Sequence, residues 1–569
     1  MYRFKISEMK VNSTKGVMSL VPKKVNVIVG PNNSGKSRLL KELRDYLSGD
    51  RRDIKILADI DFGYPEGFSE LDAAYEIEAK MVQHPHGNWM LKAYTNKPDR
   101  GLDMTSSLES YFTRNINLVS ENWRDYYTRI VANKNSEDFF SCFGALFFQY
   151  LGTEEKLTIC KTQRDYGMDS NSTNYLSSFK YNEELLNELA NKVKRLFNKD
   201  IYLDSRTLGD RLVFRVGEDF EYIRSKIITN EAEAWKLFSE KMLDDQGDGL
   251  KSFVSTFLSL KYCKNDVLLL DEPEAFLHPP LARQLGEMIG EEQSGNKTIF
   301  IATHSVEVLK GILSKSTDVN VIRITQPKPY ENEIRILNQE VLNTILQNPL
   351  LRVSRVLEGI FCERVVITEA EADELVYQEL IEKIFPESGL FFAHGQNKQT
   401  LTTIAKLYHE IGVDCEIITD FDVLRVPSEF YQFLSLMPLE ERERQLLQNY
   451  AVKLREVVSN AVDTTGLSED DIKRVQKGNR DEVYHKQGIR YFDETYKTHI
   501  RRTIERLSSL RFHILETGEL ETLLEDYGVS YQEKNKWIVE AINKIAELKA
   551  EEIAQESLLY RFISGIVRQ

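Results

Sequence analysis

Two short apolar runs in the second half of the chain end in acidic residues. They are VVITEAEAD at Val365–Asp373 and EIITDFD at Glu416–Asp422. Because alternate residues of an extended strand point to the same side, Asp420 and Asp422 can reach one ion. Clustered carboxylates suit hard cations such as Mg²⁺ or Mn²⁺. Two such ions about 4 Å apart can activate a water and stabilise the leaving oxygen of a phosphodiester displacement.

The acids of the first run have a simpler explanation when they are taken alone. Acidic side chains favour the amino terminus of a helix, so EAEAD could be a charged helix start. The second run, TDFD, makes a metal site the better interpretation. Its candidate ligands are Glu369, Asp373, Asp420 and Asp422.

A third stretch repeats the pattern nearer the carboxyl end. HILETGELETLLEDY at His513–Tyr527 has an apolar strand followed by Glu519 and Glu521, and Lys534 and Lys536 come soon after. Amphipathic helices with exposed acids and lysines explain each of these residues equally well when taken singly.

A glycine-rich loop, GPNNSGKS, lies between an apolar strand and a helical run near the start of the chain. This is the strand–loop–helix context of a phosphate-binding loop. Its glycines let the backbone curl around phosphates, Lys36 reaches the β and γ phosphates, and Ser37 supplies a magnesium ligand. We therefore expect ATP to bind with Mg²⁺. The expected nucleotide-binding residues of the loop are Gly30, Pro31, Asn32, Asn33, Ser34, Gly35, Lys36 and Ser37.

Two later apolar strands also end in residues that suit ATP hydrolysis. VLLLDE ends in Asp271, which can hold magnesium, and Glu272, which can orient or deprotonate the attacking water. TIFIATHS places His304 where it can contact the γ-phosphate. Between the loop and these strands, the turn QGDGLKSF contains Gly247 and Gly249 and can bind the γ-phosphate held by a partner subunit.

The order of strand-like and helical segments predicts an α/β protein with two domains. From Gly247 onward strands and helices alternate, which indicates a largely parallel sheet covered on both faces. We place an ATPase domain at 1–345, with a helical insertion at about 105–240 that includes strand-like KLTIC and RLVFRV. The second α/β domain spans 346–569, and a polar helical insertion interrupts it at about 427–509.

Composition sets limits on the class of protein. A chain of 569 residues is too long for one core. No apolar stretch approaches the roughly 20 residues of a membrane span, and the amino terminus lacks the apolar core of a signal peptide, so we expect a cytoplasmic protein with no membrane partner. Five scattered cysteines without a CxxC pair argue against disulfides and zinc.

The net charge of −15 requires any surface that binds nucleic acid to be local. KVKR and HIRRTIERLSSLRFH are candidates, although a solvated helical face explains each of them better.

The motifs GPNNSGKS, QGDGLKS, LLLDEPEAFLHP and IATHS together resemble the ATPase of the ABC class. The resemblance is to the branch shared by RecF, SMC proteins and the overcoming-lysogenization-defect (OLD) nucleases. It implies a head-to-head dimer with ATP between one phosphate loop and the other subunit's glycine-rich turn. It also suggests Gln163 in ICKTQRD as a glutamine-loop residue, and an ordinary exposed glutamine explains that residue equally well.

ERVVITEAEADELVYQEL and TDFD resemble the motifs of a Toprim fold, and the likeness to the OLD class spans nearly the whole chain. The family usually has glycine where this chain has Ala370, and more often aspartate where it has Glu519. By this resemblance Glu519 is the first choice as a further metal ligand and Glu521 the second. Lys536 would stabilise the pentavalent transition state.

The resemblance implies an ATP-regulated, metal-dependent DNA endonuclease, a homodimer or higher oligomer that acts in antiphage defence. Its cofactors would be ATP and Mg²⁺, with Mn²⁺ or Ca²⁺ able to substitute at the Toprim site. OLD proteins occur alone, in Gabija with a helicase-like partner, and as retron effectors beside a reverse transcriptase and its multicopy DNA.

Two other functions remain open from the sequence. One is an SMC-like or RecF-like ATP-dependent DNA-binding or regulatory protein with an inactive Toprim domain that acts through a partner. The other is a topoisomerase-like enzyme with a catalytic tyrosine, which 26 tyrosines do not exclude.

Overall fold

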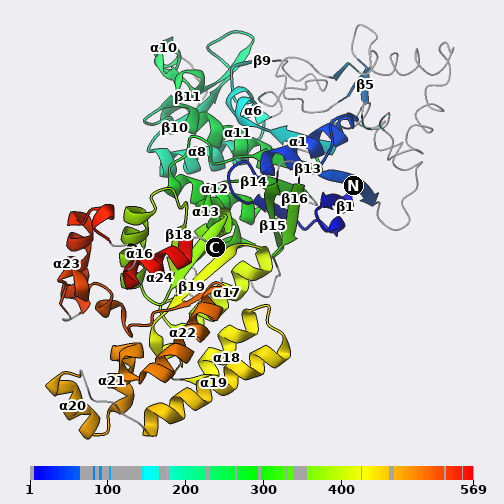
Figure 1. Cartoon of the computed structure of the whole chain (residues 1–569). Helices are drawn as coiled ribbons and strands as arrows, with labels where there is room; N and C mark the ends of the chain where they lie inside the picture. Colours follow the sequence, from blue (N-terminus) through cyan, green and yellow to red (C-terminus); the bar gives the residue numbers. More distant parts are fainter. Residues whose placement is uncertain are drawn as a thin grey trace. The chain divides into compact units, whose positions relative to one another are not determined.

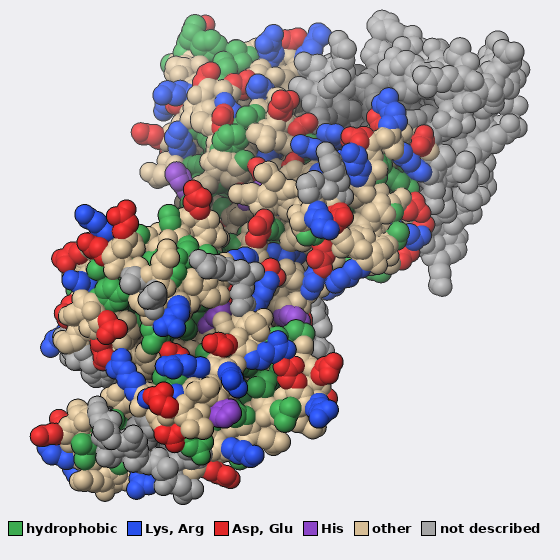
Figure 2. Space-filling model, in the orientation of Figure 1, with side chains coloured by type: hydrophobic (Ala, Val, Ile, Leu, Met, Phe, Trp, Pro, Cys, Tyr) green, Lys and Arg blue, Asp and Glu red, His purple; other side chains and the backbone are tan. Residues whose placement is uncertain are grey.

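The chain forms two α/β units in a computed structural model (Figure 1). The units are Met1–Ile336 and Leu337–Gln569, and each is treated by itself. Figure 2 shows acidic and basic side chains interspersed over both units on the visible face. The described residues are 5–63, 81–83, 89–91, 102–103, 137, 140, 144, 147–165, 176, 179–224, 231–262, 265–292, 297–328, 331–337, 355–424, 426–460, 467–530, 534–553, 555 and 557–567.

A six-stranded sheet organises the first unit. Five of its strands are parallel, and the edge strand β16 is antiparallel. Three central strands are buried along their whole length and read as continuous apolar runs, as expected for a parallel sheet covered on both faces. The strand order is β16 (Glu331–Ile336), β15 (Val319–Lys328), β3 (Val25–Val29), β14 (Thr298–Ala302), β13 (Val267–Asp271) and β8 (Phe148–Leu151).

Helices and a small antiparallel sheet accompany this sheet (Figure 1). The helices are α1 (Lys36–Leu47), α11 (Asp248–Tyr262), α12 (Pro279–Glu291) and α13 (Val306–Lys315). The small sheet consists of β2 (Gly16–Leu20), β1 (Lys5–Ser13) and β4 (Leu57–Gly63). Apolar residues of α1, β1, β4 and the large sheet share one core, so the phosphate loop rests on a packed support.

The region expected to be a helical insertion contains both helices and strands where it is described. RLVFRV is strand β11 (Arg211–Gly217), as predicted. The prediction of a strand for KLTIC is wrong, because Lys156 and its neighbours lie in helix α6 (Thr153–Thr158) and the turn after it. The backbone N–H of Gly152 donates to the Glu155 side chain and fixes the start of this helix. Much of the expected insertion, between 104 and 136, lies outside the described residues.

Further elements lie between β4 and α11, in and around the expected insertion. They are β5 (Met81–Gln83), β6 (Trp89–Leu91), β7 (Leu102–Asp103), β9 (Gln163–Arg164), α8 (Glu183–Phe197), β10 (Asp200–Asp204), α9 (Glu221–Arg224), α10 (Glu231–Ser239) and β12 (Lys241–Met242).

The second unit is built on a four-stranded parallel sheet. The strand order is β18 (Phe391–His394), β17 (Arg364–Thr368), β19 (Asp414–Thr419) and β20 (Phe512–Ile514). Helices α16 (Glu371–Ile384), α17 (Lys398–Ile411), α23 (Lys534–Glu547) and α24 (Leu558–Val567) belong to the same unit. Helices α16 and α23 lie side by side although they are far apart in sequence (Figure 1). Trp537 of α23 and Tyr377 of α16 share one buried core with the sheet.

A run of helices separates β19 from β20 in the sequence. It comprises the 3₁₀ turn η3 (Phe421–Leu424), α18 (Pro427–Leu436), α19 (Glu441–Asn460), α20 (Glu469–Gln476), α21 (Arg480–Gln487) and α22 (Glu494–Ser508). Among the helices described here, none is both long and apolar enough to span a bilayer.

Candidate functional site

The phosphate loop joins β3 to α1 and has the backbone that its glycines permit. Gly30 and Gly35 have φ angles of 147° and 97°, which favour glycine. A Cβ atom on Gly30 would lie 2.1 Å from the Ile324 carbonyl oxygen, so this position also needs glycine for space. The Lys36 ammonium donates to the carbonyl oxygens of Gly30 and Pro31, at 2.8 and 2.5 Å. Burial lowers the pKa of Lys36 to about 8.

The two acids after β13 are held in different ways. Asp271 is buried; its Oδ2 accepts from the Tyr150 hydroxyl at 2.9 Å, while its Oδ1 has no hydrogen-bond partner in the described part of the chain. A buried carboxylate oxygen left open in this way fits a magnesium ligand. Glu272 has a φ of 48°, a conformation that costs energy for a residue with a Cβ.

A buried lysine supports the strained turn at Glu272. Lys156 is fully buried, and its ammonium donates to the carbonyl oxygen of Asp271 at 2.8 Å and to that of Glu272. Because both hydrogen bonds go to the backbone, Lys156 does not occupy the carboxylates of Asp271 and Glu272. Burial lowers the pKa of Lys156 to about 8.

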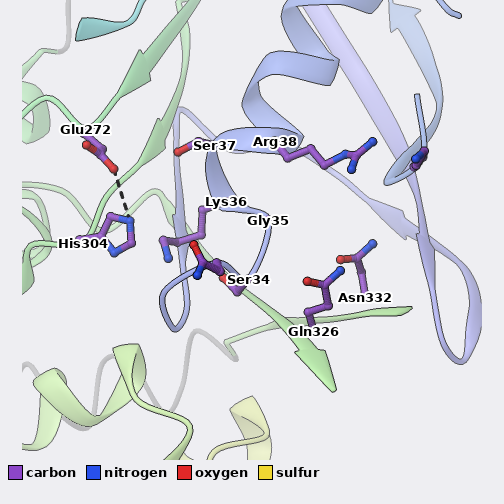
Figure 3. A pocket seen from close by; sticks show the side chains of 11 residues that line it. Ser34, Gly35, Lys36, Ser37, Arg38, Glu272, His304, Gln326 and Asn332 are labelled. Atoms are coloured by element: carbon purple, nitrogen blue, oxygen red, sulfur yellow. Dashed lines mark ion pairs between the residues drawn. The ribbon is translucent and has the colours of Figure 1, made fainter. Parts of the chain in front are cut away.

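His304 lies opposite Glu272 (Figure 3). The His304 Nε2 and Glu272 Oε1 atoms are 3.4 Å apart. Burial, with a further contribution from Lys36, lowers the pKa of His304. Glu274 fixes the backbone beside the histidine, since its Oε1 accepts from the Thr303 hydroxyl and from the His304 N–H, at 2.7 and 2.9 Å. The strand ends thus direct an acid and a neutral imidazole toward the phosphate loop.

These residues share a cavity of about 400 Å³ with the phosphate loop (Figure 3). Sequence reasoning missed four of its lining residues, Arg38, Lys55, Gln326 and Asn332. Gln326 and Asn332 come from β15 and β16, far from the loop in sequence. Of these four, only Arg38 was within reach of a sequence signal, because it follows the loop directly. The complete lining is Asn33, Ser34, Gly35, Lys36, Ser37, Arg38, Lys55, Glu272, His304, Gln326 and Asn332.

The glycine-rich turn lies at the start of α11 and is not part of that cavity's described lining. A Cβ atom on Gly249 would lie 2.7 Å from the Phe276 carbonyl oxygen, whereas one on Gly247 would meet no atom of the described residues within 4 Å. Gln163 is buried and not an exposed glutamine. Its amide donates to the Ile159 carbonyl oxygen at 2.6 Å and accepts from the Leu176 N–H at 3.3 Å.

The acids of the second unit gather at one edge of its parallel sheet. Glu369 follows β17 directly, Asp420 follows β19, and the two strands are neighbours in the sheet. Asp373 lies in the first turn of α16 and accepts from the Ala370 N–H at 3.1 Å. Asp422 lies in η3, whose first residue is fixed by a backbone hydrogen bond to the Gly518 carbonyl oxygen.

Burial and neighbouring acids disfavour the ionised forms of Glu369 and Asp420. The pKa of Glu369 rises to about 7, chiefly through burial and then through Asp422 and Asp373, while Lys398 opposes the rise. The pKa of Asp420 rises well above its usual value through burial and through its acidic neighbours, which include Glu521. Repulsion among buried carboxylates is the cost that a bound cation removes.

The residues fit a metal ion, but they are not assembled around one. Among the residues that the structure describes, Glu369 Oε1 is a buried oxygen with no hydrogen-bond partner, which fits an unused ligand. In the parts of the chain that are described, no group of three or more His, Cys, Asp or Glu side chains is arranged to hold a metal. The acids would therefore have to draw together around an ion.

The remaining predicted residues lie on the elements after β20. Glu521 is buried in the 3₁₀ turn η5 (Leu520–Thr522), and Glu519 precedes that turn and is half-buried. Lys536 is an exposed residue of the first turn of α23. Ala370 has a φ of −134°, an extended conformation that any residue adopts, so alanine in place of glycine causes no backbone strain.

Sequence reasoning missed Lys398, which lies among the acids. Its ammonium contacts Asp422 Oδ1 and lies 3.9 Å from Glu369 Oε2. Lys398 begins the helix after β18, the neighbour of β17. Its position after a parallel strand is the same signal that identified the acids.

Two family models match the chain. The first, described as "AAA domain, putative AbiEii toxin, Type IV TA system", matches residues 101–310. The second, "Overcoming lysogenization defect protein-like, TOPRIM domain", matches residues 360–422. The first match spans β13, β14 and the glycine-rich turn, and the phosphate loop precedes it. The second match contains Glu369, Asp373, Asp420 and Asp422.

Individual relatives match shorter stretches. A Methanosarcina acetivorans protein named "Putative ABC transporter ATP-binding protein" is 31% identical over 136 residues, which are 22% of this chain and 47% of that protein. The uncharacterised protein MJECL11 of Methanocaldococcus jannaschii is 32% identical over 72 residues, which are 12% of this chain and 63% of that protein. The chain thus spans about half of the length of the first relative and less than two thirds of the length of the second.

Solved structures similar to the chain include heads of SMC proteins. The SMC head bound to the C-winged helix domain of ScpA has a TM-score of 0.35 and 12% identity, over 60% of this chain and 99% of that one. The SMC head domain from Thermotoga maritima has a TM-score of 0.30 and 13% identity, over 59% and 99% of the two chains.

The chain is an ATPase domain joined to a carboxyl-terminal Toprim domain, and the predicted α/β fold class is confirmed. In this order the two domains match an OLD-family ATPase–Toprim protein, so the predicted family resemblance is confirmed.

Proposed function

We propose that the protein is an ATP-regulated DNA endonuclease that depends on a divalent metal and acts as an antiphage defence effector. The observation that carries the proposal is the set of buried and half-buried carboxylates at the carboxyl edge of the β17–β19 sheet. Burial and the neighbouring acids raise the pKa of Glu369 and Asp420, which is unfavourable for folding unless a cation or substrate compensates their charges.

In this proposal the acids of the second unit hold Mg²⁺, which Mn²⁺ or Ca²⁺ can replace. Bound there, the metal would activate a water and stabilise the leaving oxygen of a phosphodiester. The chain's own residues would position the metal and bind the scissile phosphate. Lys536 would stabilise the negative charge of the transition state. The proposed ligands are Glu369, Asp373, Asp420, Asp422, Glu519 and Glu521.

The first unit would bind ATP with Mg²⁺ at its phosphate loop. The residues from Gly30 to Ser37 would hold the phosphates, and Ser37 and Asp271 would hold the metal. Glu272 would orient the attacking water, and the neutral imidazole of His304 would contact the γ-phosphate. Gly247 and Gly249 would bind the γ-phosphate held by a second copy, which requires a homodimer or a higher oligomer.

In this proposal, nucleotide binding in the first unit controls DNA cleavage in the second. Because ATP and DNA would bind on separate units, we propose that nucleotide gates access to the Toprim acids and does not drive cleavage directly. A co-encoded defence partner, either a helicase-like protein or a reverse transcriptase with its multicopy DNA, would supply the trigger.

Nicking of supercoiled plasmid tests the activity. Wild type should nick DNA with Mg²⁺ or Mn²⁺ and lose this activity with EDTA, and Asp420→Ala should be inactive. Asp470→Ala is the matched control, because Asp470 is 86% exposed on α20 of the same unit. The absence of metal-dependent nicking by wild type would refute the proposal.

The gating proposal needs a separate comparison. Lys36→Ala should change the nucleotide response of cleavage and leave the Toprim residues intact. Cleavage with an unchanged nucleotide response in that variant would refute gating while leaving the nuclease assignment in place.

One observation favours the alternative, an ATP-dependent DNA-binding or regulatory protein with an inactive Toprim domain. Within the described residues no ready-made metal group exists, and Lys398 pairs with two of the acids. The plasmid assay distinguishes the two functions, since the alternative predicts DNA binding without nicking. For the topoisomerase-like function, Tyr377 is a tyrosine that lies beside the acids, and it is buried and so not exposed to a DNA backbone.

A further inference from the structure

Lys398 is a cationic residue that the fold places beside Glu369 and Asp422. It is the first residue of α17, and the turn before it is fixed on both sides. The Gly395 N–H donates to the Thr368 carbonyl oxygen at 3.0 Å, which ties the turn to the end of β17. Asn397 caps the helix by accepting from the Thr400 N–H at 2.9 Å. The position of Lys398 is therefore set by the sheet edge that positions Glu369.

The ammonium of Lys398 bridges acids from two strands. It contacts Asp422 Oδ1, beyond β19, and lies 3.9 Å from Glu369 Oε2, beyond β17. The Lys398 side chain is only 14% exposed, so solvent screens these contacts weakly. A lysine carries a compact charge on a flexible stem, so it can occupy the place of a small cation and later leave it.

We propose that Lys398 is a placeholder cation, whose ammonium neutralises Glu369 and Asp422 until a divalent ion binds between them and displaces it. This inference rests on the proposed metal site and adds its regulation. Two cations cannot share the same carboxylate oxygens without strong repulsion. The metal affinity of the site is therefore the intrinsic affinity of the acids reduced by competition with Lys398. The same competition accounts for the acids being close together but not arranged around an ion.

The competing explanation is a permanent structural ion pair. In that case Lys398 holds the two acids in position, and its removal would weaken metal binding or leave it unchanged. A placeholder makes the opposite prediction, because its removal frees the acids for the metal.

Calcium binding to the full-length protein, without nucleotide or DNA, separates the two explanations. Isothermal titration calorimetry with Ca²⁺ alone measures affinity for wild type, Lys398→Met and Lys398→Gln. Both variants should bind Ca²⁺ at least about fivefold more tightly than wild type. Lys398→Arg keeps the charge and should stay near the wild-type affinity. Lys406→Met is the matched control, because Lys406 is exposed on the same helix.

Thermal melting gives a second readout that needs no bound metal. In EDTA, Lys398→Met should melt below wild type because the acids lose their countercharge. With saturating Ca²⁺ this deficit should shrink or disappear. Lys406→Met should match wild type in both conditions.

The outcomes distinguish the inference from the function on which it rests. If wild type binds Ca²⁺ more tightly than Asp420→Ala, but Lys398→Met and Lys398→Gln bind it no more tightly than wild type, the placeholder is refuted and the metal site stands. If wild type and Asp420→Ala bind Ca²⁺ equally or not at all, the metal site itself fails. In that case displacement is refuted too, and any loss of stability in Lys398→Met marks a structural ion pair.

Discussion

Replacing Glu369 with glutamine removes a charge that the folded protein holds at a cost, so the change should stabilise the metal-free protein. Glu369 lies beside Asp422 and Asp373, and its pKa rises from 4.5 to about 7. The unfolded chain titrates near 4.5, so between these values the folded state binds more protons than the unfolded state. Stability therefore falls as the pH rises from about 4.5 to about 7, and above that range the full cost is present.

The difference between the two pKa values sets the size of the effect. At about 1.4 kcal/mol for each tenfold change in proton affinity, it corresponds to about 3 kcal/mol. The Glu369 side chain is only 20% exposed, so solvent screening reduces this figure little. For a unit of this size, Glu369→Gln should raise the melting temperature at pH 8 by on the order of 5–10 °C. At pH 4.5 the gain should vanish, because wild-type Glu369 is then protonated.

The assay is thermal melting in EDTA at pH 8 and pH 4.5, with Glu379→Gln as the control. Glu379 is an exposed residue of α16 in the same unit, and its replacement should leave the melting temperature unchanged at both values of pH. With Ca²⁺ present, wild type should gain stability and Glu369→Gln should gain little. If Glu369→Gln is no more stable than wild type at pH 8, the charge of Glu369 does not destabilise the folded protein. This reason for a metal site would then be wrong.

Three further predictions concern the first unit. Lys36→Ala should abolish binding of fluorescent ATP analogues because it removes the buried ammonium of the phosphate loop, while retained tight binding would place nucleotide elsewhere. Gly30→Ala should lower the free energy of unfolding by about 2 kcal/mol or more, since the added Cβ atom would lie 2.1 Å from the Ile324 carbonyl oxygen; an unchanged denaturation midpoint would contradict this. Burial lowers the pKa of Lys156 to about 8, so between pH 8 and about 10 the unfolded chain holds the proton more tightly than the folded protein. The melting temperature of wild type should therefore rise relative to that of Lys156→Met across this range, and parallel pH profiles would refute the assignment.

The candidate acids were predictable because a parallel sheet brings the carboxyl ends of its strands to one edge. Glu369 and Asp420 follow apolar runs, so their meeting required only that the two strands be neighbours. Lys398 follows the strand FFAH in the same way. Lys398 was missed because the search for metal ligands considered acidic side chains and not the basic side chains beside them.

The errors in the first unit have a different cause. KLTIC has the apolar pattern of a short strand, but Lys156 lies in α6 and donates to the carbonyl oxygen of Asp271. The partner lies more than a hundred residues away, so no local pattern contains it. Gln326 and Asn332 enter the nucleotide cavity for a similar reason, through the pairing of β15 with β16.

The two sites place a lysine in different ways: Lys156 is fully buried and Lys398 is half-buried. In the ATPase unit Lys156 bonds the backbone carbonyl oxygens of Asp271 and Glu272 and leaves Asp271 Oδ1 open for a cation. In the Toprim unit Lys398 contacts the carboxylates themselves. In the proposal the first site would offer Asp271 Oδ1 to magnesium directly, whereas the second would have to exchange Lys398 for a divalent ion before it could act. A change that moved Lys398 by a few ångströms would alter metal affinity without altering any ligand. Under the proposed displacement of Lys398, control of the nuclease would require only a small movement at the start of α17.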